Sequence, residues 1–380
     1  MDCMAKPSFP SLSFAAHVRQ WFLRFATVIF FATFLATLAA APRWPQALPK
    51  DKANLRVMTY NVYEGADLTT AFTAQDQSHF VSAISAILAN VRATNPPART
   101  EAIARQIGKA RPTLVSLQEA TQWSTCPTAD YQSCSGPQTV LYDLLDLIED
   151  ALRAQGLNYK EVGRVTVNEL HAPGMTGADR VIVFYSQRSA ILARADAHEL
   201  QLSNVRSARF TANHPVPIAG GGTFVIRRAW VSVDVKFHRT SFRFIDTQLE
   251  AFDPDTNYNQ AKELISGPAH TSLPVVIAMD SNSRASPPTN DFTPTYTNFL
   301  KHGFKDAWTE THGDGPGYTS GQDPTLLNPV SKVTQRIDLI LLRGGLQARA
   351  VKLFGGQRAD RVRGLWPSDH LAVAATLGAE

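Results

Sequence analysis

The sequence is poor in charged residues and in cysteine, and it contains only one long uncharged apolar run. Charged residues make up 18% of the 380 positions and hydrophobic residues 44%, which excludes an intrinsically disordered or fibrous chain. With 37 Lys and Arg against 33 Asp and Glu, the net charge is +4, too small for a protein dedicated to coating duplex nucleic acid. The sequence shows no internal repeat or low-complexity tract, so it favours a folded globular protein.

Cysteine occurs only at Cys3, Cys126 and Cys134. No second cysteine pair or neighbouring histidine completes a tetrahedral set, which argues against a zinc site. Cys126 and Cys134 lie in a stretch rich in Ser, Thr, Pro and Gly, STCPTADYQSCSGP. In an oxidising compartment they would form one disulfide that closes a small loop, and without export they would remain free thiols.

The long apolar run lies near the amino terminus. Residues 1–24 carry three basic residues against one acid, and residues 25–41 (FATVIFFATFLATLAAA) are uncharged and end in small residues. This order is typical of a secretory signal peptide, which we predict over residues 1–41 with cleavage between about Ala39 and Ala41. The protein would then be exported, either secreted or periplasmic. An uncleaved signal-anchor is the alternative, because the run is close to the shortest that spans a membrane.

A polar, proline-containing linker over residues 42–54 precedes a domain that we expect to span residues 55–380. Several predicted strands follow one another through short turns, which implies antiparallel hairpins and excludes a purely parallel, doubly wound sheet. We therefore predict an α/β fold with two packed mixed β-sheets and helices outside. The strands are expected at Leu55–Val62, Thr113–Leu117, Arg180–Tyr185, Ala229–Phe237, Ser241–Thr247, Pro274–Met279, Arg336–Leu342 and Leu371–Leu377, and helices at His79–Arg92, Arg99–Ala110, Leu141–Ala154 and Asn257–Ser266.

Polar side chains stand where several predicted strands end or begin. Each signal is weak alone, because an Asp after an apolar run usually makes a turn or caps a helix. Their order and spacing together predict one crevice in which rigid strands hold carboxylates and amides. The residues are Asn61, Glu119, Gln248, Glu250, Asp280, Asn282, Asp369 and His370.

These residues belong to the motifs YNVYEGA, LVSLQEA, DTQLEAF, IAMDSNS, QRIDLILLRG and WPSDHLAV. The series resembles the endonuclease/exonuclease/phosphatase superfamily of metal-dependent phosphodiesterases and phosphatases, from about Leu55 to Leu377. The resemblance implies a four-layered α/β sandwich, Mg²⁺ or Mn²⁺ as cofactor, and an active site at one end of the two sheets. Its secreted members include nucleases and phosphodiesterases that cleave sphingomyelin or phospholipids.

The resemblance also implies a role for individual residues at a metal. Glu119 of the QE motif would be the first metal ligand, and Asp369 would join it directly or through water. Asn61 would hold the metal-bound phosphate or an outer-shell water. Such a site suits Mg²⁺, which prefers carboxylate oxygens and keeps several of its waters.

Hydrolysis of a phosphodiester further requires an oriented water and a stabilised leaving oxygen. The resemblance implies that Asp280 orients or deprotonates the water and that Asn282 donates a hydrogen bond to the phosphoryl oxygen. His370, paired with Asp338 of the RID motif, would present a polarised imidazole to the phosphate as electrophile or acid.

Gln248 departs from the pattern, because many relatives have a histidine at this strand end. An amide cannot exchange a proton at neutral pH. The metal could serve the leaving group instead, the amide could only position phosphate, or activity could be reduced or lost. Glu169 and His171, expected in a loop before DRVIVFYS, are weaker candidates for a contribution.

The substrate is less well defined than the chemistry. The basic residues Lys352, Arg358, Arg361 and Arg363 near the last motif suit a polyanion, although a solvated loop explains them equally well. The pair Arg227 and Arg228 next to a strand suits a polyanion in the same way. The segments most able to set selectivity are residues 64–111 and the loop between the two later cysteines.

We predict an exported, metal-dependent and nuclease-like phosphodiesterase that acts as a monomer without a protein partner. The alternative substrate is a phospholipid or sphingomyelin rather than a nucleic acid. The alternative of another class is a catalytically silent protein that binds a phosphorylated ligand, and Gln248 is the feature in its favour.

Overall fold

The computed structural model describes residues 55–219, 222–287 and 289–379. The predicted signal peptide and the linker at residues 42–54 lie outside this part of the chain. Within the described residues, none of the helices has both the length and the apolar character needed to cross a membrane.

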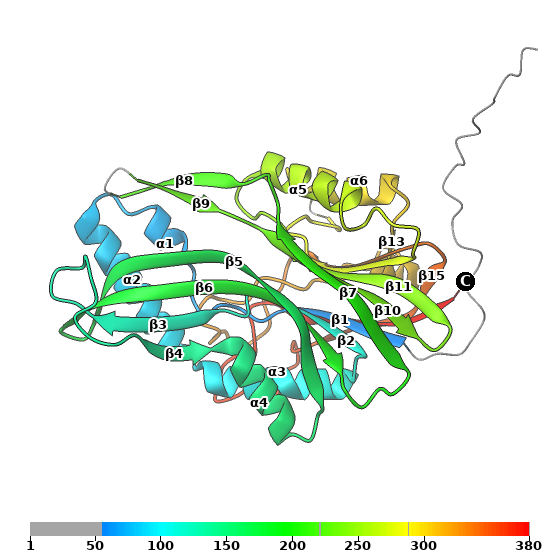
Figure 1. The fold of residues 1–380 in the computed structure, drawn as a ribbon, viewed down its shortest axis with the longest axis horizontal. Coiled ribbons are helices and arrows are strands. Elements are labelled where there is room, and N and C mark those ends of the chain that lie inside the picture. The colour runs from blue at the N-terminus through cyan, green and yellow to red at the C-terminus, as the bar shows by residue number, and fades with distance from the viewer. Residues whose placement is uncertain (1–54, 220–221, 288, 380) are drawn as a thin grey trace, which may run out of the picture. The chain divides into compact units, whose positions relative to one another are not determined.

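The first sheet has eight strands in the order β15-β16-β1-β2-β6-β3-β4, and β5 pairs with β6 (Figure 1). Strands β1 and β2 are parallel, whereas the other pairs are antiparallel, so the sheet is mixed as predicted. Its strands are β1 Leu55–Asn61, β2 Leu114–Gln118, β3 Gln122–Pro127, β4 Thr139–Asp143, β5 Tyr159–Thr176, β6 Asp179–Arg194, β15 Leu346–Phe354 and β16 Ala372–Ala379.

The second sheet has six strands in the order β13-β14-β12-β11-β10-β7, and β8 and β9 form a separate two-stranded ribbon. Strands β11 and β12 are parallel, and β10 and β11 form the predicted hairpin. The strands are β7 Leu200–Arg209, β8 His214–Ile218, β9 Gly222–Ile226, β10 Ala229–Phe237, β11 Thr240–Gln248, β12 Val275–Asp280, β13 Lys305–Asp306 and β14 Asp338–Arg343.

Helices cover the outer faces of both sheets, which gives four layers. Ile103 and Ile107 of α3 and Ile148 of α4 pack on the first sheet, whereas Leu264 of α5 and Phe299 of α6 pack on the second. This arrangement is the predicted α/β sandwich. The helices are α1 Thr69–Phe72, α2 Gln77–Ala93, α3 Pro96–Ala110, α4 Leu144–Ala154, α5 Pro254–Ser266, α6 Thr293–Lys301 and α7 Ala307–His312, with a 3-10 turn at Arg358–Asp360.

The four long helices begin after an Asp or Asn whose side chain accepts a hydrogen bond from a backbone N–H of the first turn. These capping residues are Asp76, Asn95, Asp143 and Asp253. Such a cap stabilises a helix by about 1 kcal/mol, because it satisfies a donor that has no partner within the helix. The cap also explains why the predicted helix at Leu141–Ala154 begins only at Leu144: the residues before Asp143 belong to β4.

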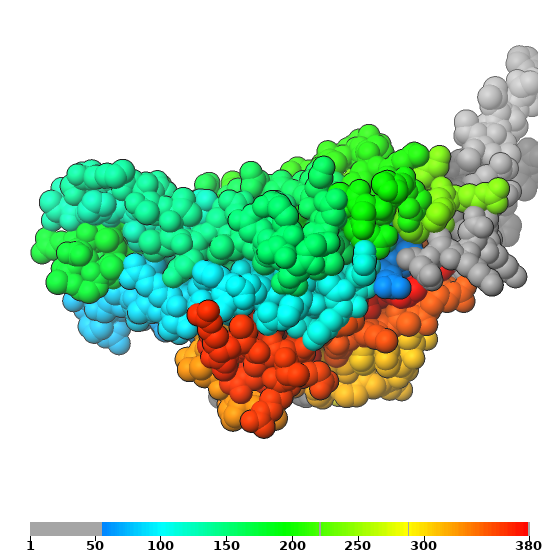
Figure 2. Space-filling model, turned by 90° about the horizontal axis from the view of Figure 1, so that it is seen from below, coloured from blue at the N-terminus to red at the C-terminus, as the bar shows by residue number. Residues whose placement is uncertain are grey.

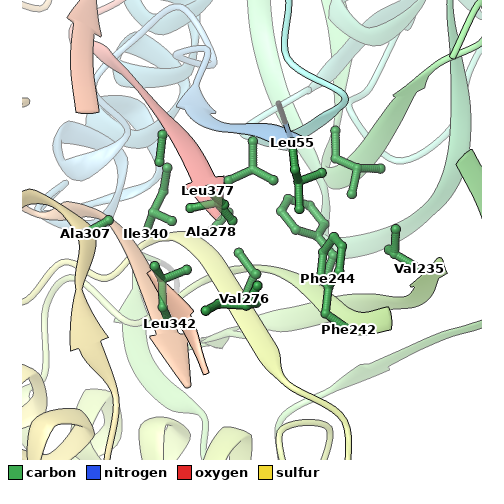
Figure 3. Packing of buried hydrophobic residues seen from close by; sticks show 14 of the residues in the cluster. Leu55, Val235, Phe242, Phe244, Val276, Ala278, Ala307, Ile340, Leu342 and Leu377 are labelled. Atoms are coloured by element: carbon green, nitrogen blue, oxygen red, sulfur yellow. The ribbon is translucent and has the colours of Figure 1, made fainter. Parts of the chain in front are cut away.

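The two sheets face each other across an apolar core (Figure 3). Phe242 and Phe244 of β11 and Leu342 of β14 are fully buried there, and Leu55 of β1 and Leu377 of β16 face them from the first sheet. Each large apolar side chain buried in this way contributes about 1.5–3 kcal/mol. The interface is therefore rigid, and the strand ends that leave it are held in place.

Both parallel pairs end at the same edge of the sandwich. In the first sheet Asn61 is opposite Gln118, and in the second Gln248 is opposite Asp280, which in turn is opposite Asp338. Glu119 follows Gln118 directly. The register of the two sheets therefore assembles most of the predicted polar residues at one edge.

The C-terminal segment packs against α3, as the orange-red and cyan surfaces of Figure 2 show. The fully buried Arg99 of α3 donates from Nη1 to the carbonyls of Val62 and Pro367 at 2.9 and 3.0 Å, and from Nη2 to that of Tyr63 at 3.0 Å. This arginine ties the loop after β1 to the segment that carries Asp369.

Some elements differ from the predictions. Residues 159–176, expected to include a loop around Glu169 and His171, form the long strand β5, which pairs with β6 along its length. Strand β5 contains Gly163, Pro173 and Gly174, which obscure the strand pattern in the sequence. Cys126 of β3 and Cys134 form the predicted disulfide.

Candidate active site

Two carboxylates from different sheets meet at the edge where the parallel strands end. The Asn61 amide donates from Nδ2 to Glu119 Oε1 at 2.8 Å and to Asp280 Oδ2 at 3.0 Å. Gln248 donates from Nε2 to the same two oxygens, at 2.8 and 3.1 Å. Two neutral amides therefore hold two acidic groups close together and supply donors that reduce their repulsion.

A buried ion pair orients the Gln248 amide. Arg228 donates from Nη1 to Gln248 Oε1 at 2.8 Å, and its Nε lies 3.5 Å from Glu250 Oε2. With its oxygen bound to a cation, the amide must present its NH₂ group to Glu119 and Asp280. Gln248 is thus fixed as a hydrogen-bond donor at the strand end where the resemblance implied a histidine.

Glu119 and Asn282 adopt left-handed backbone conformations, with φ of 59° and 50°. Such conformations are uncommon for residues other than glycine, and they tend to occur at functional sites. The Asn282 backbone N–H donates to Asp280 Oδ1 at 3.1 Å, and Asn282 Nδ2 donates to the Leu249 carbonyl at 2.9 Å. One N–H of the Asn282 amide group remains for another acceptor, and the residue lines the cavity described below.

Asp338 and His370 form a buried pair, with Asp338 Oδ2 2.8 Å from His370 Nδ1. Burial raises the pKa of Asp338 to about 6, although His370 opposes the rise. Burial lowers the pKa of His370, but the carboxylates of Asp338 and Asp369 outweigh this effect and raise it well above its usual range. The two carboxylates therefore favour the protonated form of the His370 ring. His370 Nε2 lies 3.2 Å from Ser320 Oγ.

Asp369 is held by its neighbours at the same edge. Ser368 Oγ donates to the Asn61 carbonyl at 2.7 Å and lies 3.3 Å from Asp369 Oδ1. Burial raises the pKa of Asp369 to about 7; His370 opposes the rise, and the charge of Glu119 adds to it. Burial, and to a smaller extent the neighbouring carboxylate, thus disfavours the charged form of Asp369, and a bound cation would oppose this effect.

The donor set fits a hard divalent cation. Glu119 Oε1 accepts from two amides, but Oε2 accepts only the Glu64 backbone N–H at 3.1 Å, so this oxygen keeps one lone pair for a metal. Asp338 Oδ1 is buried without a hydrogen-bond partner. Oxygen ligands of this kind are those that Mg²⁺ and Mn²⁺ prefer.

Another group within the described residues could also hold a metal, because ligand atoms of Asp280, Asp338 and His370 all lie within 4.8 Å of one another. We favour Glu119 and Asp369 instead. Asp338 Oδ2 and His370 Nδ1 already bind each other, which leaves only Oδ1 of Asp338 without a partner, and an imidazole nitrogen is a poor ligand for Mg²⁺. Asn61 is oriented with its nitrogen toward the carboxylates, and its Oδ1 accepts the Tyr63 N–H at 3.0 Å.

Several predicted residues lie away from this cluster. Glu169 is exposed on β5, and His171 lines a separate, shallow cavity beside Phe184. Arg228 is buried in the ion pair with Glu250, so it does not form a surface for polyanions as the sequence suggested. The basic residues Lys352, Arg358, Arg361 and Arg363 do not line the cavity at the site.

Other residues of the site were missed from the sequence. Glu64 accepts a short hydrogen bond from the Tyr185 hydroxyl, and burial together with the charge of Glu119 raises the Glu64 pKa well above its usual range. Ser320 beside His370 lies in a loop that no sequence motif marked. The YNVYEGA motif does contain Glu64, so its position three residues after Asn61 was the one available signal.

A cavity of about 320 Å³ opens from the carboxylate cluster. Glu119, Asp280, Asn282, Asp369 and His370 line one end of it. Its volume lies at the lower end of the range for small-molecule sites. The arrangement can thus hold a phosphate group beside a metal, with part of the substrate extending into the cavity.

Comparison with known proteins agrees with this geometry. A sequence model described as the Endonuclease/Exonuclease/phosphatase family matches residues 58–370. The match includes every residue of the carboxylate and amide cluster. No curated protein shows a significant match to the chain.

Solved structures share the fold at low sequence identity. An endonuclease/exonuclease/phosphatase family protein from Bacteroides thetaiotaomicron is 17% identical, with a TM-score of 0.51, and the alignment covers 86% of this chain and 98% of that one. The mannosyl-6-phosphatase Bt3783 of the same organism is 16% identical, with a TM-score of 0.50 and coverage of 85% and 99%. TDP2 from D. rerio, complexed with single strand DNA product, is 13% identical, with a TM-score of 0.50 and coverage of 86% and 99%.

Proposed function

The chain belongs to the Endonuclease/Exonuclease/phosphatase family, and we propose that it is a metal-dependent phosphodiesterase that activates water at the carboxylate cluster. Membership in this family makes it a phosphoester-hydrolysing enzyme. The observation that carries the finer proposal is the bridge of Asn61 and Gln248 between Glu119 and Asp280, beside Asp369 and the Asp338–His370 pair.

Glu119 and Asp369 would hold one divalent ion, Mg²⁺ or Mn²⁺. When bound, the ion supplies charge neutralisation at the phosphoryl oxygens and at the leaving oxygen. Asn61 and Gln248 hold Glu119 and Asp280 in place, so the first acid serves the ion while the second keeps one lone pair, on Oδ1, for the water.

Asp280 accepts the proton of the attacking water in this proposal. Its Oδ1 is held by the Asn282 backbone N–H and its Oδ2 by the two bridging amides, so the carboxylate has one fixed orientation. A general base within hydrogen-bond reach of water contributes about 10²–10⁴-fold to such reactions.

His370 stabilises charge on the phosphate. With Asp338 bound to Nδ1, the imidazolium has Nε2 as its second donor, and a phosphoryl oxygen could take the place of Ser320 Oγ beside this atom. The free N–H of Asn282 provides another donor on the same side. Gln248 contributes no proton, because its amide is committed to the two carboxylates and to Arg228.

The fold alone does not determine the substrate. One solved neighbour is a mannosyl-6-phosphatase and another binds single-stranded DNA product, so the same sandwich serves different phosphate esters. The sequence favoured a nuclease-like activity with phospholipid cleavage as the alternative. A polynucleotide groove would need cations along the path of the backbone, yet Arg228 is the only lysine or arginine among the described residues that line this cavity.

Export is a further part of the proposal. It rests on the apolar run at residues 25–41 and on the Cys126–Cys134 disulfide, which suits an oxidising compartment. Mass analysis of the exported protein should find an amino terminus between about Ala39 and Ala41. Exported protein that retains Met1 would contradict the cleavage.

The experiment that tests the metal-dependent activity is hydrolysis of bis(p-nitrophenyl) phosphate in Mg²⁺, Mn²⁺ or EDTA. We expect activity with either metal and none with the chelator. Glu119→Gln removes an anionic ligand and should raise the Mg²⁺ concentration for half-activation by about tenfold or more. Glu101→Gln, an exposed change on α3, is the matched control and should leave the titration unchanged. An identical titration for Glu119→Gln would remove this carboxylate from the ligand set.

A further inference from the structure

The cavity at the carboxylate cluster has a second, apolar end. Beyond the carboxylates its walls are aliphatic and aromatic, and they come from segments at the periphery of the sandwich. Helix α2 contributes Ile84 and Ile87, β6 contributes Val183, and β9 contributes Phe224 and Ile226. We call this part of the cavity the apolar chamber.

Aromatic rings close the chamber on the side of α1. Phe72 of α1 stacks on Phe224 of β9, with ring centroids 5.7 Å apart, and meets Phe252 edge-on at 6.4 Å. Figure 1 shows the β8–β9 ribbon reaching toward α1 at the end of the sandwich where α2 lies. Phe252 nevertheless remains 48% exposed, so its ring lies where the chamber opens to solvent.

An unfilled apolar space beside a cluster of charged side chains does not stabilise the protein, and the sandwich fold does not require it. Apolar side chains that face a cavity lose packing contacts that a filled core would give them. The space is continuous with Asp280, Asn282 and His370, where the phosphate is expected to bind. A group that fills it would therefore be attached directly to that phosphate.

The charges of the cavity restrict what this group is. Glu64, Asp67, Glu119, Asp280 and Asp369 line it. Apart from the His370 ring, which is held by Asp338, Arg228 is the one cationic side chain among the described residues that line the cavity, and it is already bound to Glu250 and Gln248. A second phosphate or other anion would be repelled, whereas an uncharged hydrocarbon would gain about 0.8 kcal/mol for each buried CH₂ group.

We propose that the apolar chamber binds an aliphatic chain esterified to the scissile phosphate, so that the substrate is an amphiphilic alkyl phosphodiester rather than a polynucleotide. This inference rests on the proposed function, because it places the phosphate at the carboxylate cluster. The total volume of about 320 Å³ holds one short chain or part of a longer one, but not two chains side by side.

The test uses p-nitrophenyl phosphodiesters whose second ester group is methyl, butyl or octyl. All three release the same p-nitrophenolate, so differences in kcat/KM report on the alkyl group alone. We expect kcat/KM with Mg²⁺ to rise with chain length by about two- to fourfold per methylene until the chamber is full. A flat series with measurable hydrolysis would overturn the chamber as a chain site while leaving the phosphodiesterase proposal intact.

Matched variants locate the effect in the chamber. Phe224→Ser should flatten the chain-length series, because it replaces an aromatic wall of the chamber with a small hydroxyl-bearing side chain. Phe184→Ser is the control: Phe184 is also half-buried, on β6, but lines the shallow cavity beside His171 instead. Equal flattening in both variants would contradict the inference.

A binding measurement tests whether the chamber holds an aliphatic chain, and it does not depend on catalytic turnover. Calorimetry with methyl-, hexyl- and phenylphosphonate should give the tightest binding for hexylphosphonate and the weakest for the methyl compound. If phenylphosphonate binds more tightly than its six-carbon alkyl counterpart, the occupant is aromatic and the aliphatic assignment is wrong. If no ester is hydrolysed with any metal but hexylphosphonate still binds best, the proposed function fails and the chamber stands.

Discussion

The two ends of the cavity are built in different ways. At the polar end, Asn61, Glu119, Gln248 and Asp280 leave the ends of two parallel strand pairs, and each makes at least two hydrogen bonds within the site. At the apolar end, the walls come from helices α1 and α2, strands β5 and β6, and β9 of the two-stranded ribbon. The rigid part of the fold carries the chemistry, and the peripheral segments shape what is attached to the phosphate.

Among the variants that distinguish the polar end of the cavity from its apolar end, Asp280→Asn is expected to have the largest effect on kcat. The new amide cannot accept a proton, and its NH₂ group would face the Asn61 and Gln248 donors or, in the flipped orientation, the Asn282 backbone N–H. We expect kcat to fall by about 10³-fold, within the range for a lost general base. The loss should be equal for the methyl and octyl esters, because the chamber is untouched.

Asp253→Asn is the control for this variant, because an asparagine at position 253 can cap α5 in the same way as Asp253 does. Its activity should match that of the wild-type protein, and thermal denaturation should show that both variants are folded. A residual rate within tenfold of wild type for Asp280→Asn would mean that another group accepts the proton.

The Gln248 bridge should give the next largest effect. Gln248→Leu removes the donors to Glu119 and Asp280, and hydrogen bonds to charged groups contribute about 1.5–3 kcal/mol each. We expect kcat/KM to fall about 10- to 100-fold on both ester lengths. Gln248→Glu keeps an acceptor for Arg228 but adds another carboxylate, and it should be at least as damaging.

Gln187→Leu is the matched control for the bridge. Gln187 is buried on the neighbouring strand β6 and lines the cavity, but its only contact with the bridge is at 3.5 Å, to Gln248 Oε1. We expect a loss of less than about threefold. Equal losses of kcat/KM in Gln187→Leu and Gln248→Leu would show that the site tolerates no apolar residue at this edge. The hydrogen bonds from Gln248 to Glu119 and Asp280 would then make no specific contribution to activity.

The polar end could largely be predicted from the sequence, because each residue follows an apolar run whose strand is set by local pattern. Strands β1 and β12 were expected within one residue of their observed limits at the ends that carry Asn61 and Asp280. The orientation of each amide could not be predicted. It depends on partners far along the chain, such as the Arg228 guanidinium behind Gln248.

The apolar chamber could not be predicted, because its walls depend on pairing between distant segments. Strand β5 pairs with β6 through register shifts between Glu161 and Gly163 and between Thr166 and Asn168. A register shift changes which side chains face the interior, and no local periodicity records it. For this reason Asn168 lines the cavity, whereas the neighbouring Glu169 is exposed.

The polar end also continues one layer into the core, at Asp246 of β11. Asp246 is fully buried, and its Oδ1 lies 2.5 Å from Ser116 Oγ and 2.7 Å from Gln118 Nε2. Ser116 Oγ is also 2.7 Å from the Ala278 carbonyl, although a hydroxyl has only one proton. A protonated Asp246 resolves this conflict by donating to Ser116, which then donates to Ala278. Burial accordingly raises the Asp246 pKa to about 8.

A last expected effect concerns stability rather than turnover and comes from Asp246→Asn. Because the folded-state pKa of about 8 lies above the ordinary value of 3.8, the neutral carboxyl contributes stability that is complete below pH 3.8 and is lost as the pH rises toward 8. The free energy of unfolding of the wild-type protein should fall across this window, relative to the variant, by up to about 1.4 kcal/mol per pH unit. Urea denaturation at pH 5, 6, 7 and 8 measures the difference. Asp253→Asn is again the control, since hydrogen bonds from Thr256 lower the Asp253 pKa and its titration lies below this range. Parallel pH profiles for the wild-type protein and Asp246→Asn would show that Asp246 is ionised in the folded protein, and that the charge of the polar end extends into the core.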